Sequence, residues 1–223
     1  MSAAGSVLDA RLEFGRPGRQ AQVWLAEQAA DLKRADLFRP VTFIVPNLYA
    51  GRQALWTLAE HGGYVNVRPL RLADLALRLA GPAARRGQLL TPVLEAAAVR
   101  AAAAGQPALT RVAEQQALQQ ALGQLFRELR RREVDIARLE RARLSAMGCA
   151  ALDAYAGFRE LTANYLDATA IRQAAVEQLL PGPTQQLLEC GPLLLFLPTR
   201  IDPVDARLLA AAAQWTPLRV LLP

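Results

Sequence analysis

Two kinds of hydrophobic pattern alternate over the first eighty residues. Apolar and charged positions alternate over 8–14, which predicts a strand with one exposed face, and apolar residues recur at helical spacing over 19–33. The continuous apolar run 41–45 is typical of a strand buried on both faces of a parallel sheet. The pattern then predicts, in order, a helix, a short strand and a helix, over 49–60, 64–67 and 72–79. This order predicts an α/β fold with a parallel, doubly wound sheet.

The middle of the chain shows only helical patterns. Residues 82–188 contain no convincing strand, and we expect helices over 93–104, 110–131, 133–150 and 152–165. Asp167 is a candidate N-cap for a last helix that runs to Leu180. The pattern therefore predicts a large all-helical insertion over 82–188.

Apolar runs then resume the sheet. The run 193–197 predicts a buried strand, 203–213 a helix and 218–222 a final strand. Residues 1–81 and 189–223 are thus expected to form one discontinuous α/β domain around the insertion. We expect the strand that ends at Leu197 to lie beside one of the first two strands. A last strand with no helix after it suggests a piece of a longer protein.

Composition narrows the chemistry. The net charge of +6 suits a polyanionic partner, although a surface rich in arginine explains it equally well. Lys33 is the only lysine of the chain. His61 is the only histidine, and this excludes metal sites rich in histidine. The two cysteines lie far apart, and no apolar run is long enough for a signal peptide or a membrane span. We therefore expect a cytoplasmic protein with no membrane partner.

The turn after the first strand is the natural place for a phosphate. Glycines before a helix offer free backbone N–H groups, but a working P-loop also needs G-x-x-x-x-G-K-[ST]. Counted from Gly15, Gln20-Ala21-Gln22 stands where Gly, Lys and Ser or Thr belong. The sequence thus predicts no ATP hydrolysis, and DNA-stimulated turnover would contradict it. Passive anion binding by Arg16 and Arg19, or a merely structural turn, are the two remaining interpretations.

Seven arginines gather late in the insertion. They are Arg127, Arg130, Arg131, Arg132, Arg138, Arg141 and Arg143. Acidic residues interleave with them, so we expect a salt-bridged solvent face, with a nucleic-acid surface as the alternative.

Aromatic residues and the histidine have structural explanations at this stage. The tryptophans Trp24, Trp56 and Trp215 fall within predicted helices or at their ends, and core packing explains each of them better than base stacking does. His61 is expected to sit at a helix C-terminus with its hydrogen bonds satisfied.

The order of segments resembles the N-terminal region of AddB-like proteins, the B subunits of AddAB-type helicase–nucleases. More broadly, it resembles a UvrD-like superfamily-1 helicase domain 1A with its helical 1B insertion. Gly15–Gln22 replaces the Walker A loop, and Pro46-Asn47-Leu48-Tyr49-Ala50 resembles the T-N-x-A-A segment that contacts the single-strand backbone. The stretch Gly62–Ala76 follows the AddB-like pattern GG..NVR.LTL..LA most closely. Strand 193–197 corresponds to the Walker B strand, but Pro198-Thr199 stands where the metal-binding acids belong.

The resemblance implies a P-loop-like sheet and a catalytically inactive helicase-like domain of a DNA double-strand-break repair helicase–nuclease. Such a domain guides single-stranded DNA and scaffolds its partners: the helicase-like and PD-(D/E)XK nuclease domains of a longer chain, and a partner helicase subunit. It implies no catalytic residue, metal or cofactor here. The degenerate nucleotide loop would be Gly15, Arg16, Pro17, Gly18 and Arg19, and the DNA contacts Asn47, Tyr49 and Arg200. A scaffold that touches only protein, and a domain that senses ATP without hydrolysing it, remain as alternatives.

Overall fold

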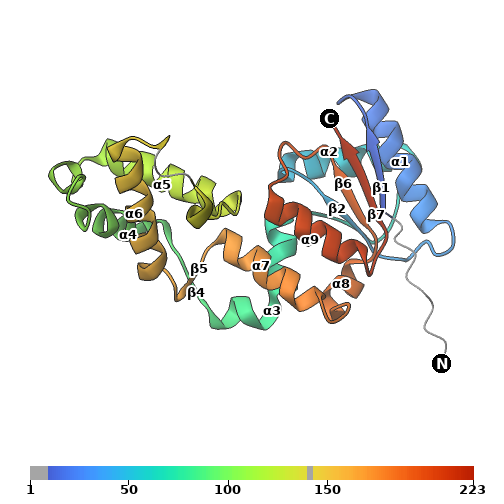
Figure 1. Ribbon diagram of the computed structural model, residues 1–223. Helices are drawn as coiled ribbons and strands as arrows, with labels where there is room; N and C mark the ends of the chain where they lie inside the picture. Colours follow the sequence, from blue (N-terminus) through green and yellow to red (C-terminus); the bar gives the residue numbers. More distant parts are fainter. Residues whose placement is uncertain (1–9, 140–142) are drawn as a thin grey trace. The chain divides into compact units, whose positions relative to one another are not determined.

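The computed structural model describes residues 10–139 and 143–223 (Figure 1). Leu8 and Asp9 of the predicted first strand, and Glu140 and Arg141 near the arginine cluster, lie outside the described residues. The chain forms two compact units, one from residues 1–81 with 171–223 and one from residues 82–170. The first division falls at Gly81, where a positive φ of 52° interrupts helix α3 (Leu72–Arg86).

A five-stranded parallel sheet forms the first unit, in the order β1-β7-β6-β2-β3. Its strands are β1 (Ala10–Phe14), β2 (Val41–Ile44), β3 (Val67–Leu70), β6 (Leu193–Phe196) and β7 (Leu218–Leu222). Strand β6 pairs with β2, with Phe43 opposite Leu194, so the expected position of the strand that ends near Leu197 is confirmed. The α/β class with a mostly parallel sheet is confirmed as well.

Helices cover both faces of this sheet. Helix α1 (Arg19–Lys33) connects β1 to β2, and α2 (Leu48–Glu60) connects β2 to β3; both connections run across the sheet toward β3. Helix α9 (Pro203–Ala213) connects β6 to β7, and this connection runs in the opposite direction. Because parallel crossovers are right-handed, α9 lies on the face opposite α1 and α2. The core beneath α1 joins Leu25 and Ala29 to strand residues such as Phe43.

Strand β1 differs from its prediction. All five of its residues are exposed, including the apolar Leu12 (58%) and Phe14 (75%), so the implied buried apolar face is wrong. The reason is position: β1 is an edge strand, and α9 packs over β7 instead. Alternation predicted the strand itself but could not predict what covers it.

The second unit is mainly helical. It contains α4 (Pro92–Ala104), η1 (Thr110–Val112), α5 (Gln116–Arg131), η2 (Ile136–Arg138) and α6 (Ala146–Leu161). Phe126 of α5 packs against Tyr155 and Phe158 of α6, with ring centroids 5.3 and 5.1 Å away. These rings form the centre of a core that also takes buried residues from α4.

Three expectations for the insertion are wrong. Strands β4 (Gln88–Leu89) and β5 (Tyr165–Leu166) pair in parallel, so the insertion is not all-helical; two-residue strands are too short to show a hydrophobic period. The helix expected over 110–131 is interrupted between η1 and α5. Instead of one helix over 133–150, the described residues form η2 and then α6, whose N-cap Ser145 accepts a hydrogen bond from the Gly148 N–H.

The second division lies at residue 170, and not at 188 as the sequence suggested. Helix α7 (Ala168–Leu179) begins where predicted, with Asp167 accepting from the Ala170 N–H at 2.7 Å. The Trp215 indole N–H donates to the Leu179 carbonyl at 2.9 Å, which ties the end of α7 to the sheet unit. Helix α8 (Gln185–Cys190), which the sequence did not predict, is tied there by a bond from the Thr42 hydroxyl to the Cys190 carbonyl.

Candidate nucleic-acid interface

The sheet has a topological switch point between β2 and β6. The chain leaves β2 toward β3 on one side and leaves β6 toward β7 on the other, although the two strands are direct neighbours. In open parallel sheets, ligands bind in the crevice outside the carboxyl ends of the strands at such a point. The loops after β2 and β6 meet this description, and both were singled out from the sequence.

The loop after β2 contains Asn47 and Tyr49. The Asn47 side chain is the N-cap of α2, with Oδ1 accepting from the Ala50 N–H at 2.8 Å. This leaves the Asn47 amide nitrogen as a donor for a phosphate or sugar oxygen. The Tyr49 side chain is 72% exposed, and its hydroxyl accepts a 3.2 Å hydrogen bond from the Gln53 amide. The loop thus presents an exposed ring beside an amide donor.

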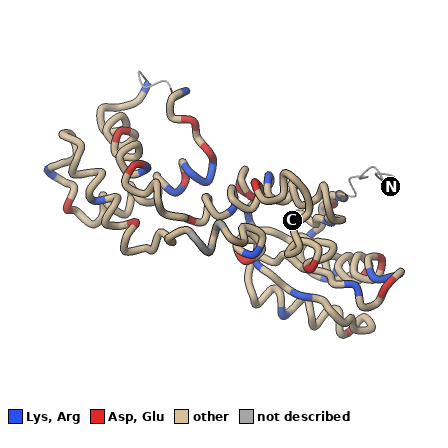
Figure 2. The backbone as a smooth tube through the Cα atoms, turned by 90° about the horizontal axis from the view of Figure 1, so that it is seen from below, with Lys and Arg blue, Asp and Glu red and all other residues tan. Residues whose placement is uncertain are grey.

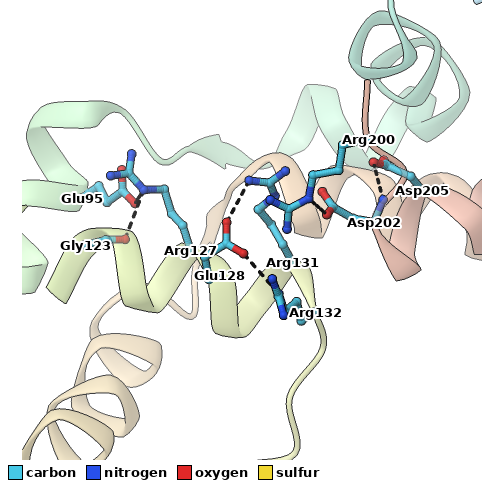
Figure 3. Close-up of polar contacts among 9 residues, drawn as sticks. All are labelled: Glu95, Gly123, Arg127, Glu128, Arg131, Arg132, Arg200, Asp202 and Asp205. Carbon is cyan, nitrogen blue, oxygen red and sulfur yellow. Dashed lines mark hydrogen bonds and ion pairs between the residues drawn. The ribbon is translucent and has the colours of Figure 1, made fainter. Parts of the chain in front are cut away.

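The loop after β6 is occupied by ion pairs (Figure 3). Arg200 Nε lies 2.6 Å from an oxygen of the buried Asp202 carboxylate, so the charge of Arg200, which the resemblance implies as a DNA contact, is compensated within the loop. Asp205, also buried, forms an ion pair with Arg172 of α7 and accepts from the Asp202 N–H at 3.4 Å. Both carboxylates lie at the N-terminus of α9, where the helix dipole favours negative charge.

The loop after β1 retains features of an anion site without a P-loop. Gly18 is the N-cap of α1, with a φ of 119° and no side-chain cap, so the first N–H groups of the helix have no partner within it. Arg16 and Arg19 are exposed and, among the described residues, make no ion pair. Pro17 lies between Arg16 and Gly18, and Gly15 donates its N–H to the Leu222 carbonyl at 2.9 Å.

The structure separates this loop from the other two. Strands β1 and β2 are three positions apart in the sheet, and neighbouring strands are about 4.8 Å apart, so the loop after β1 begins about 14 Å from β2. Strands β2 and β6 are neighbours, which brings the Asn47–Tyr49 loop beside the Arg200 loop. The predicted nucleotide loop and the predicted DNA contacts therefore lie at the same edge of the sheet, but they do not form one pocket.

Sequence reasoning missed Trp56. Its side chain is 64% exposed on α2, so the expectation of core packing is wrong for this residue. Trp24 is buried as expected, whereas Trp215 is 38% exposed and forms the hydrogen bond to Leu179 described above. The helical period of α2 contained the necessary signal, because Trp56 lies opposite the buried Gly51, Ala54 and Leu58.

Five described arginines of the cluster are salt-bridged, as the leading interpretation predicted: Arg127, Arg130, Arg131, Arg132 and Arg138. Arg130 lies 3.0 Å from Asp167, and Arg138 lies 3.0 Å from Asp135. Figure 3 shows Arg131 and Arg132 sharing the Glu128 carboxylate, and Arg127 paired with Glu95 and bonded to the Gly123 carbonyl. Figure 2 shows acidic residues interleaved with basic ones along this part of the chain. Carboxylates thus compensate much of the positive charge there.

The lysine and the histidine both have structural roles. Lys33 is buried, its ammonium donates to the carbonyls of Leu37 and Arg39, and burial lowers its pKa. His61 is the C-cap of α2, with Nδ1 2.7 Å from the Thr57 carbonyl oxygen, as predicted. Over residues 10–139 and 143–223, no cluster of three or more His, Cys, Asp or Glu side chains is arranged to hold a metal ion. None of the described helices combines the length and the apolar character needed to span a bilayer.

Comparison with known proteins adds no family to this description. No protein-family model matches the sequence, and no curated protein matches it significantly.

Proposed function

We propose that this chain is a catalytically inactive, helicase-like domain of an AddB-like helicase–nuclease, and that it holds single-stranded DNA at the carboxyl edge of a P-loop-like sheet. The observation that carries the proposal is the switch point between β2 and β6, with the exposed Tyr49 ring and the Asn47 amide beside it. Ligands of open parallel sheets bind at this edge.

The arrangement of the two units supports the helicase-like part of the proposal. A mainly helical unit is inserted between β3 and β6 of one parallel sheet, the order in which the resembling family places its 1A and 1B parts. Strand β6 corresponds to the Walker B strand of the resembling family. It lies in the middle of the sheet, directly beside β2, the strand that leads to Asn47.

Two observations support a domain without ATPase chemistry. Gln20-Ala21-Gln22 offers neither the lysine nor the hydroxyl that a P-loop uses to hold a nucleotide and Mg²⁺. The two carboxylates after β6, Asp202 and Asp205, are each paired with an arginine. A divalent cation would have to displace both guanidinium groups to reach these carboxylates.

The geometry favours unpaired over duplex DNA. The face of an exposed tyrosine ring stacks on a base only when that base is free of its duplex, and such stacking tolerates any sequence. The amide nitrogen of Asn47 complements it with a contact to the sugar–phosphate backbone, which carries no sequence information. We therefore propose weak, sequence-independent binding of single strands.

The test is the affinity for a labelled oligothymidine and for a duplex of the same length, measured by fluorescence anisotropy. The variant is Asn47→Ser with Tyr49→Ala, because serine retains a side-chain N-cap for α2 while it removes the amide donor. We expect this variant to lose about fivefold or more in affinity, the equivalent of one stacked base. Phe38→Ala is the matched control: Phe38 is 74% exposed, but it precedes β2 at the opposite end of the strands.

Two results would contradict the proposal. A scaffold that touches only protein predicts no binding of oligothymidine at all. Binding that survives the Asn47–Tyr49 double change but is lost on replacing Arg127, Arg131 and Arg132 would move the interface to the insertion. Arg130 is left unchanged in that variant because its ion pair with Asp167 is largely buried.

A further inference from the structure

Helix α2 carries a stripe of exposed side chains that packing does not explain. Tyr49 is 72% and Trp56 64% exposed, and Arg52 between them is exposed as well. The three residues are spaced i, i+3 and i+7, which places them on one face of a helix. The opposite face packs so closely that a Cβ on Gly51 would come within 2.8 Å of Pro69. The stripe therefore faces away from the sheet.

The spacing of the stripe is regular. Tyr49 and Trp56 are seven positions apart along the helix, a rise of about 10.5 Å along the axis. Arg52 lies between them and, among the described residues, makes no ion pair, and Gln53 bonds the Tyr49 hydroxyl from the same helix. Glu60, in the last turn of α2, places a negative charge beyond Trp56. The stripe thus has two rings, a cation between them and an anionic end.

We infer that Tyr49, Arg52 and Trp56 form one track for an unpaired nucleic-acid strand, in which Trp56 stacks on a second, non-adjacent base and Arg52 neutralises a phosphate between the two stacked bases. This inference rests on the proposed function and extends its site from the edge of the sheet along α2. Aromatic platforms that alternate with cations are the arrangement by which proteins bind single strands without sequence preference. The strand would run from the β2 loop along the helix and not across to the paired Arg200.

A protein partner fits this face less well. Tyrosine, arginine and tryptophan are enriched at protein interfaces too, so it is the charge, and not the residue types, that favours a nucleic acid here. The net charge of +6 also complements a polyanion, and Arg52 is one of the cations not compensated among the described residues.

The experiment follows the fluorescence and the affinity of Trp56 variants with oligothymidine. Stacking should quench the emission of Trp56, so the wild-type signal should fall on titration and that change should be absent from Trp56→Phe. Trp56→Ala should weaken binding about fivefold or more, and Trp56→Phe should restore most of it. Circular dichroism checks that both variants fold, as expected for an exposed position.

The outcomes separate this inference from the proposed function. Oligothymidine binding that depends on Tyr49 but ignores Trp56→Ala would overturn the track and leave the proposed function standing. Binding with unchanged Trp56 emission would likewise overturn the track. If wild-type protein binds no oligothymidine, both the proposed function and the track are wrong.

Discussion

Gly191 sets how closely the turn after α8 approaches the strand leading into β2. Its φ is +65°, and a Cβ at this position would lie 2.1 Å from the Pro40 carbonyl oxygen. Side chains other than glycine adopt such a φ only at a cost, and here the neighbouring backbone also has no room. The contact lies just before β2 and β6, the two strands that flank the candidate interface.

Gly191→Ala should therefore lower the free energy of unfolding by about 3 kcal/mol or more, measured by urea denaturation. Gly63→Ala is the matched control, since Gly63 has a similar φ of +69° but a Cβ added there would meet nothing within 4 Å. The control should cost about 1 kcal/mol, the cost of the backbone conformation alone. Equal losses in the two variants would show that the close approach to Pro40 is unimportant.

Single residues also show which parts of the site the sequence reveals. Asn47 and Tyr49 were predictable because a polar loop directly follows a buried apolar strand. The ion pair between Arg200 and Asp202 could not be predicted, because the hydrophobic pattern of a sequence does not show which rotamers two nearby side chains adopt. The prediction for Trp56 was wrong because the size of a tryptophan favours the core, whereas its position on the helical face places it in solvent.

Among the elements, the helices with local start signals were predicted best. Thr91 caps α4 through the Leu94 N–H, and Asp167 caps α7, both as their residue types indicate. The strands β4 and β5, and the short helix α8, depend on tertiary pairing and have no such signals. The order of strands in the sheet also needs the observed pairing, so the switch point could not be placed from the sequence alone.

Asp167 stabilises its element twice, as the cap of α7 and as the partner of Arg130 on α5. Asp167→Ala should cost about 2 kcal/mol or more in unfolding free energy, because both contacts are lost and Arg130 is left partly buried without its carboxylate. Ser145→Ala, which removes only the cap of α6, should cost about 1 kcal/mol.

Asp167→Asn separates the two contributions, since the amide oxygen retains the cap but not the charge. Its cost in urea denaturation should fall between those of the other two variants. If Asp167→Ala costs no more than Ser145→Ala, the ion pair with Arg130 contributes nothing to stability.

Over the whole molecule, less of the positive charge of the arginines can bind a polyanion than the composition suggests. Carboxylates compensate many arginines of the insertion, and Arg200 is paired as well. In the described part of the first unit, Arg16, Arg19, Arg52 and Arg68 are exposed and make no ion pair. Arg52 lies on α2 within the proposed track, whereas Arg16 and Arg19 lie around the loop after β1, about 14 Å from β2, and Arg68 lies on β3.

The salt dependence of oligothymidine binding tests the central claim most directly. If about three phosphates are neutralised, the logarithm of the binding constant should fall against the logarithm of salt concentration with a slope of about −2, from about −0.7 per phosphate. Arg52→Gln should bring the slope to about −1.4, and replacing Arg127, Arg131 and Arg132 should leave it unchanged. A slope near zero, or one that changes only with the arginines of the insertion, would contradict the account.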